Sequence, residues 1–116
     1  TLLASSAASD VYKRQVLGGA MEHSKWFPEG VNTEFIQILD ETHLKMRVWE
    51  RGSGETMACG TGACAAVVAS VLNGHCKKDT DVDVLLLGGT LTIRYTGDTV
   101  LMTGNAVEVF TGTVEV

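Results

Sequence analysis

The most regular pattern in this sequence is the alternation of apolar and polar residues between positions 33 and 50. The segment 33–39 (TEFIQIL) has the period of a β-strand, and the segment 43–50 (HLKMRVWE) places Leu44, Met46 and Val48 on one face. The polar residues 40–42 between them suit a turn. We therefore predict an antiparallel hairpin over residues 33–50.

Two segments have the character of helices. Residues 61–72 are small and apolar almost all round, and Asn73-Gly74 follows as a stop signal, which predicts a helix inside the protein. A shorter helix is predicted over residues 16–26, before the single proline, Pro28.

The rest of the chain predicts further strands, which decide the fold class. Alternating segments at 82–87, 90–96 and 99–104 are separated by Gly-containing turns, and a last strand is predicted around residues 106–110 (AVEVF). One central helix and many strands indicate an α+β fold. We expect a mixed, mostly antiparallel β-sheet that wraps around the central helix.

Composition narrows the classes of partner. The chain has 116 residues, a net charge of −5, and no basic cluster longer than Lys77-Lys78, which argues against nucleic acid and anionic membranes. No apolar run approaches the roughly 20 residues of a membrane span. Three cysteines without a CxxC pair favour reduced thiols in a cytoplasmic protein and no metal site.

The segment 55–70 (ETMACGTGACAAVVAS) carries the candidate chemistry. The helix start exposes unpaired N–H groups, and Gly60, Thr61 and Gly62 can cradle a carboxylate there. Cys59 lies just ahead, where the positive end of the helix favours a thiolate. A basic sulfur beside a bound carboxylate suits removal of the proton on the α-carbon. The position also fits a cysteine that is only a small buried hydrophobe.

A longer stretch around this cysteine resembles a known family. Residues 47–66 (RVWERGSGETMACGTGACAA) resemble the signature of the diaminopimelate epimerases, which are cofactor-independent amino-acid epimerases. Residues 27–35 (FPEGVNTEF), 84–95 and 100–112 resemble other segments of that family, with Asn105 where the family commonly has proline. The resemblance covers residues 16–116, which we assign to an incomplete C-terminal domain. Residues 1–15 do not match, and we set them apart as a non-family segment that looks like translated vector or library sequence.

The resemblance implies a reaction and a set of site residues. The family interconverts LL- and meso-2,6-diaminopimelate, in lysine and peptidoglycan biosynthesis, with two cysteines that face each other across a cleft between two domains and no cofactor. It implies that Cys59 is catalytic and that Gly60 and Thr61 bind the reacting carboxylate. It also implies that Glu50 and Arg51 contact the substrate and that Asn32 holds its distal amino-acid end.

The family's N-terminal domain, with the second cysteine, is the expected partner. Cys64 lies inside the predicted helix and Cys76 past its end, so neither can replace that thiol. We therefore expect this chain alone to be nearly inactive. Two alternatives stay open, namely another cysteine racemase of the proline or hydroxyproline type and a non-catalytic carboxylate-binding module. A homodimer that pairs two Cys59 thiols is a further arrangement to consider.

Overall fold

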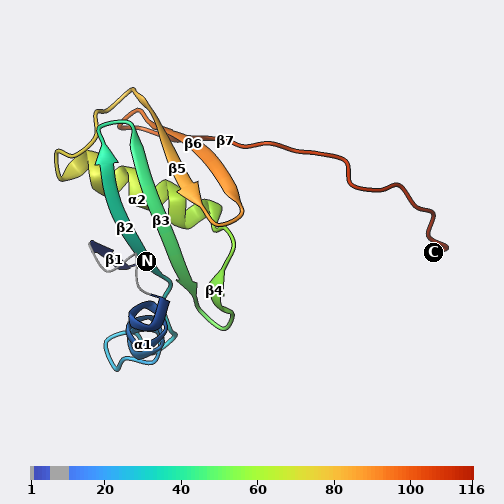
Figure 1. Cartoon of the computed structure of the whole chain (residues 1–116), viewed down its shortest axis with the longest axis horizontal. Coiled ribbons are helices and arrows are strands. Elements are labelled where there is room, and N and C mark those ends of the chain that lie inside the picture. The colour runs from blue at the N-terminus through green and yellow to red at the C-terminus, as the bar shows by residue number, and fades with distance from the viewer. Residues whose placement is uncertain (1, 6–10) are drawn as a thin grey trace.

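The computed structural model describes residues 2–5 and 11–116. Residue 1 and residues 6–10 lie outside the described part. The elements form one sheet and two helices (Figure 1), in the order β1 (Leu2–Ser5), α1 (Val11–Glu22), β2 (Thr33–Asp40), β3 (His43–Glu50), β4 (Gly54–Thr56), α2 (Gly60–Leu72), β5 (Asp81–Leu86), β6 (Gly89–Tyr95) and β7 (Val100–Thr103). β1 and the start of α1 fall in the segment 1–15 that the sequence analysis set apart, and β1 and β4 were not predicted. Among the described residues, neither helix combines the length and apolar character that crossing a bilayer requires.

The sheet is mixed, with mostly antiparallel pairs, and the predicted α+β class is confirmed. Its strand order is β1-β2-β3-β5-β6-β7, and β4 also pairs with β3. The pairs β1/β2 and β3/β5 are parallel, and the other four are antiparallel. The predicted hairpin is confirmed as β2 and β3, in which Phe35 lies opposite Arg47.

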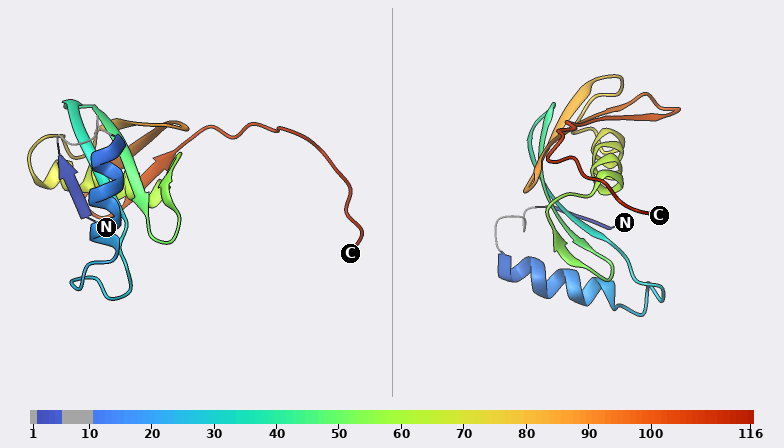
Figure 2. Two further views of the ribbon diagram at one scale, coloured as in Figure 1. Left: turned by 60° about the horizontal axis from the view of Figure 1, so that its bottom comes forward. Right: turned by 90° about the vertical axis from the view of Figure 1, so that its right-hand side faces the viewer.

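β3 organises the site because two strands share its second edge. β5 pairs with its first half, at residues 43–45, whereas β4 pairs with its last half, at residues 48–50. The chain leaves β4 where the two strands diverge and enters α2 there. The views in Figures 1 and 2 place α2 on one side of the sheet and α1 on the other.

The main core lies between α2 and the sheet. Leu44, Met46 and Val48 of β3 are buried there with the other core residues, which are Ile36, Cys59, Ala63, Ala66, Val67, Cys76, Val82, Val84 and Ile93. The small side chains of α2 let the helix approach the sheet closely. Cys64 packs against this core but is only partly buried, and Leu72 is exposed at the end of the helix, so the helix expected inside the protein is not covered along its whole length.

α1 packs against the opposite face through Trp49. A Cβ placed on Gly18 would lie 2.5 Å from Trp49 Cγ, so only glycine lets this helix come so close. The Trp49 indole N–H donates to Glu22 at 2.8 Å. The helix ends at Glu22, not near the predicted residue 26, because hydrogen-bonded turns take over at Ser24 and continue to Gly30.

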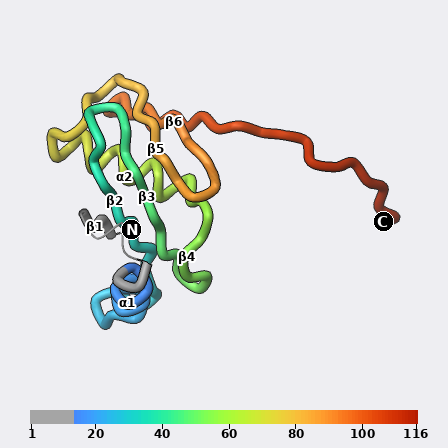
Figure 3. The backbone as a smooth tube through the Cα atoms, in the orientation of Figure 1, coloured from blue at the N-terminus to red at the C-terminus, as the bar shows by residue number. Residues whose placement is uncertain are grey.

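The strand expected around residues 106–110 is wrong. The structure has no helix or strand over residues 104–116, and Figures 1 and 3 show this segment running away from the sheet. Val107, Val109 and Phe110 are exposed. An alternating sequence forms a strand only beside another strand, and no described strand lies next to these residues.

Candidate functional site

Cys59 caps the start of α2 with its own side chain. Its backbone is extended, with φ −145° and ψ 106°, and its Sγ accepts a hydrogen bond from the Gly62 N–H at 3.4 Å. Its carbonyl accepts from the Ala63 N–H at 2.9 Å. Serine, threonine or aspartate usually supplies such a cap, so a sulfur here uses the cap position to meet the positive end of the helix.

The residues around this cap form the Gly-Thr-Gly turn that the sequence singled out. Thr61 Oγ1 lies 3.6 Å from Cys59 Sγ and can exchange a hydrogen bond with it. The N–H groups of Gly60 and Thr61 belong to the first turn of the helix, which has no acceptor within the helix. Before the cap, the carbonyl of Met57 accepts from the Gly88 N–H at 2.8 Å, which ties this loop to the turn between β5 and β6.

A second group of candidate residues gathers at the end of β3. The Arg51 backbone N–H donates to Asn32 Oδ1 at 2.8 Å, and the Arg51 guanidinium Nη1 donates to the Glu29 carbonyl at 3.0 Å. Glu50 accepts a hydrogen bond from the Thr56 hydroxyl. Thr56 is also 3.5 Å from the Ala58 carbonyl, so it links this group to the residue before Cys59.

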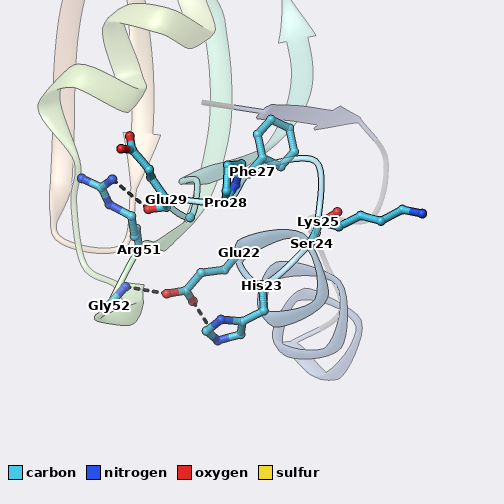
Figure 4. A pocket seen from close by; sticks show the side chains of 10 residues that line it. Glu22, His23, Ser24, Lys25, Phe27, Pro28, Glu29, Arg51 and Gly52 are labelled. Carbon is cyan, nitrogen blue, oxygen red and sulfur yellow. Dashed lines mark hydrogen bonds and ion pairs between the residues drawn. The ribbon is translucent and has the colours of Figure 1, made fainter.

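Two open hollows meet at Arg51. One, of about 240 Å³, is lined by Arg51, Asn32, Gly30 and Val31. The other, of about 450 Å³, lies between the end of α1 and the loops (Figure 4), and its lining residues are Glu22, His23, Ser24, Lys25, Phe27, Pro28, Glu29, Gly30, Arg51 and Gly52. Gly30 has φ +76°, and a Cβ there would lie 2.8 Å from Arg51 Cδ, so glycine at this position leaves room for the arginine.

Glu22, which lines the 450 Å³ hollow, connects α1 to β3 and to the loop that follows it. Its carboxylate accepts from the Gly52 N–H at 2.6 Å and from the Trp49 indole, and Figure 4 shows it between α1 and the loop after β3. These hydrogen bonds, that from Gly52 above all, lower the pKa of Glu22. Glu55 has a structural role, because its carboxylate accepts a hydrogen bond from Arg14 Nε at 2.9 Å.

Glu34 is a residue that the sequence analysis missed. It lies on β2 with none of its surface exposed, and within the described structure neither carboxylate oxygen has a hydrogen-bond partner. Burial, with a smaller contribution from the charge of Glu50, raises the pKa of Glu34 to about 7. The available signal was its position, because Glu34 alternates with Ile36 on the face that packs against the core.

The other two cysteines have surroundings unlike that of Cys59. Burial, and then the neighbouring Cys59, raises the pKa of the Cys64 thiol. Burial also raises the pKa of Cys76, with the charges of Asp40 and Glu41 adding to the effect. Both thiols therefore favour the protonated form, as a structural role requires.

The structure thus brings the expected residues together as two groups. Cys59, Gly60 and Thr61 form the helix-start group, while Asn32, Glu50 and Arg51 form the group at the end of β3. Thr56 connects the groups, but neither hollow beside Arg51 is lined by the helix-start group. In the part of the chain described here, no three His, Cys, Asp or Glu side chains are arranged to hold a metal ion.

Known proteins match this chain over a segment that includes these candidate site residues. The diaminopimelate epimerase family model matches residues 2–109. The diaminopimelate epimerase of Acetivibrio thermocellus is 52% identical over 108 residues, which cover 91% of this chain and 38% of that protein. That of Bacillus licheniformis is 56% identical over 97 residues, which cover 83% of this chain and 34% of that protein. The chain therefore spans little more than a third of these relatives' length.

A solved structure shares the fold at much lower sequence identity. It is a Bacillus anthracis phenazine biosynthesis protein of the PhzF family, with a TM-score of 0.57 and 18% identity. The similarity covers 73% of this chain and 26% of that one. At this identity the match supports the arrangement of helix and sheet and nothing about chemistry.

Proposed function

Because this chain belongs to the diaminopimelate epimerase family, we propose that it supplies one half of an active site that interconverts LL- and meso-2,6-diaminopimelate. The observation that carries the proposal is the hydrogen bond from the Gly62 N–H to Cys59 Sγ at 3.4 Å. It holds the sulfur at the helix start, beside the amides of Gly60 and Thr61. A substrate α-carboxylate bound to those amides would present its α-carbon to the sulfur.

In the proposed step, the Cys59 thiolate removes the α-proton and becomes a thiol. The electron pair of the broken C–H bond spreads onto the carboxylate, where the helix N–H groups stabilise the added charge. A thiol from the family's N-terminal domain gives its proton to the opposite face of the carbon and becomes a thiolate. The proton count is unchanged, and only the configuration at the carbon inverts.

The distal end of the substrate is assigned to Asn32 and Arg51. The observed bonds use Asn32 Oδ1 and one Nη of Arg51, so the Asn32 NH₂ group and the rest of the guanidinium are not engaged in them. An arginine fork and an amide suit a carboxylate. Glu50 is assigned to the substrate's ammonium group, with Thr56 fixing its carboxylate. These assignments favour a substrate with two amino-acid ends.

The second thiol is assigned to another domain because Cys64 lies inside α2 and Cys76 lies past its end, so neither is placed across the substrate from Cys59. A single sulfur reaches one face of the planar carbon, so this chain alone is expected to be nearly inactive. The proposed site of action is the cytoplasm, where reduced thiols persist.

The test combines this chain with a separately produced N-terminal domain from the Bacillus licheniformis relative. Incorporation of solvent deuterium at the α-carbon, followed by NMR, and conversion of LL- to meso-diaminopimelate are measured. We expect little turnover by the chain alone, a gain on mixing, and loss of that gain in Cys59→Ala but not in Cys64→Ala. Turnover that survives Cys59→Ala, or full activity of the chain alone, would contradict the proposal.

A further inference from the structure

Gly62 brings a buried carboxyl group and the candidate base to the same point. A Cβ built on Gly62 would lie 2.6 Å from Glu34 Oε1 and 3.2 Å from Cys59 Sγ. The two side chains reach this point from different elements, since Glu34 is on β2 and Cys59 precedes α2. The lack of a side chain at Gly62 therefore lets the carboxyl oxygen and the sulfur approach each other.

Glu34 has a free hydrogen-bonding capacity that a purely structural carboxyl would use. Neither of its oxygens has a partner among the described residues, although its side chain is completely buried. Leaving a buried polar group unpaired costs about 1–3 kcal/mol. Ile36, on the same face of β2, and Val48, the partner of Glu34 on β3, are apolar and offer no side-chain hydrogen bond. The Cys59 sulfur lies near the Glu34 carboxyl, on the other side of Gly62.

Two groups that are negative when ionised act on this pair, while the positive N-terminal amino group lowers the pKa of Glu34 without offsetting the effect of burial. Glu50 of β3 faces Glu34 and adds to its preference for the protonated form. Cys64 of α2 interacts with Cys59. Ionisation of Glu34 and of Cys59 at the same time is therefore unfavourable, because like charges that share a site repel each other.

We propose that Glu34 is a positioning residue that acts on Cys59 across Gly62, so that its carboxyl proton controls how readily the Cys59 sulfur becomes a thiolate. The protonated carboxyl is neutral and can donate a hydrogen bond toward the sulfur, whereas the carboxylate repels the thiolate. This inference rests on the proposed role of Cys59 as the base and assigns a function to a residue outside the substrate-contacting groups.

The experiment measures iodoacetamide alkylation of Cys59 against pH in the full chain, with each cysteine peptide quantified by mass spectrometry. In the unmodified chain we expect a profile spread over two coupled ionisations. In Glu34→Gln, which keeps the side-chain volume but removes the charge, the profile should narrow to one ionisation. Its midpoint should fall by about one pH unit, so that the rate rises about tenfold between about pH 7, above which Glu34 is ionised, and the midpoint.

Glu41→Gln is the matched control because Glu41 is an exposed glutamate that pairs with Lys77 at 2.9 Å. The alkylation profile of Cys59 in Glu41→Gln should match that of Cys59 in the unmodified chain. A Glu34→Gln profile that superimposes on the unmodified one, or that moves to higher pH, would overturn the proposal. If Glu34→Gln fails to fold, the unmodified profile decides alone, and a curve fitted by one ionisation would refute the coupling. The assay needs no substrate and no second domain, so its outcome is separate from that of the epimerase test.

Discussion

Two adjacent glycines in α1 provide a sharp test of how this helix packs on the sheet. Gly18 is buried against Trp49, and an added Cβ would meet Trp49 Cγ at 2.5 Å and its Cβ and Cδ2 at 2.7 Å. Gly19 faces a more open region, where the nearest atom, Trp49 Cζ2, would lie 3.8 Å away. Replacement by alanine should therefore have opposite effects at neighbouring positions.

The expected magnitude follows from two contributions. Alanine is favoured over glycine inside a helix by about 1 kcal/mol, and this gain applies to both variants. Overpacking at Gly18 costs about 1–3 kcal/mol because the indole of Trp49 is fixed by its hydrogen bond to Glu22 and cannot easily move. The gain from helix propensity is the same in Gly18→Ala and Gly19→Ala, so it cancels when the two variants are compared. We therefore expect Gly18→Ala to be about 1–3 kcal/mol less stable than Gly19→Ala.

Thermal unfolding followed by far-UV circular dichroism measures this difference. For a domain of this size it corresponds to a melting temperature at least about 4 °C lower in Gly18→Ala. Gly19→Ala should melt at or slightly above the unmodified chain. Equal melting temperatures for the two variants, or a more stable Gly18→Ala, would show that α1 does not lie against Trp49 as described.

Two further predictions concern ionisation. The pKa of Glu34 is about 7 in the folded chain and near 4.5 when exposed, so the folded state holds a proton that the unfolded state has lost, and the free energy of unfolding should fall as pH rises from about 4.5 to about 7. Urea unfolding at several pH values measures this fall in the unmodified chain. An equal fall in Glu34→Gln would refute the assignment. Since burial raises the pKa values of Cys64 and Cys76, iodoacetamide at pH 7.5 should label both more slowly in the folded chain than in the chain unfolded in urea, and equal rates would contradict the burial described here.

The local sequence predicted those parts of the fold in which side-chain alternation and burial agree. β3 has a clear alternation because Leu44, Met46 and Val48 face the core while the intervening residues face α1 or solvent. The first half of β2 is buried on both faces, so Glu34 stands in a continuous buried run, and its place on the face of Ile36 is the only local sign that it is buried. The tail at 106–110 has strand-like alternation, but a strand also needs a neighbour, which a local pattern cannot report.

The candidate site was predicted from its residues more fully than from its geometry. The cap by Cys59 followed from a cysteine directly before a Gly-Thr-Gly turn. The contact between Arg51 and Asn32 joins residues 19 positions apart, and nothing in the local pattern specifies it. The carboxyl of Glu34 approaches Cys59 only because β2 lies beneath the start of α2, which is a property of the assembled sheet and helix.

The small side chains along the buried side of α2 have a consequence for how far the site can tolerate change. Ala63 and Ala66 are completely buried, so their methyl groups define the gap between the helix axis and the strands below it. A bulkier residue at either position would lift or tilt the helix and carry its sulfur-bearing end away from the carboxyl groups on the strands. The distance between the Cys59 sulfur and the carboxyl groups on the strands thus depends on the small volumes of Ala63 and Ala66, which lie outside the candidate site.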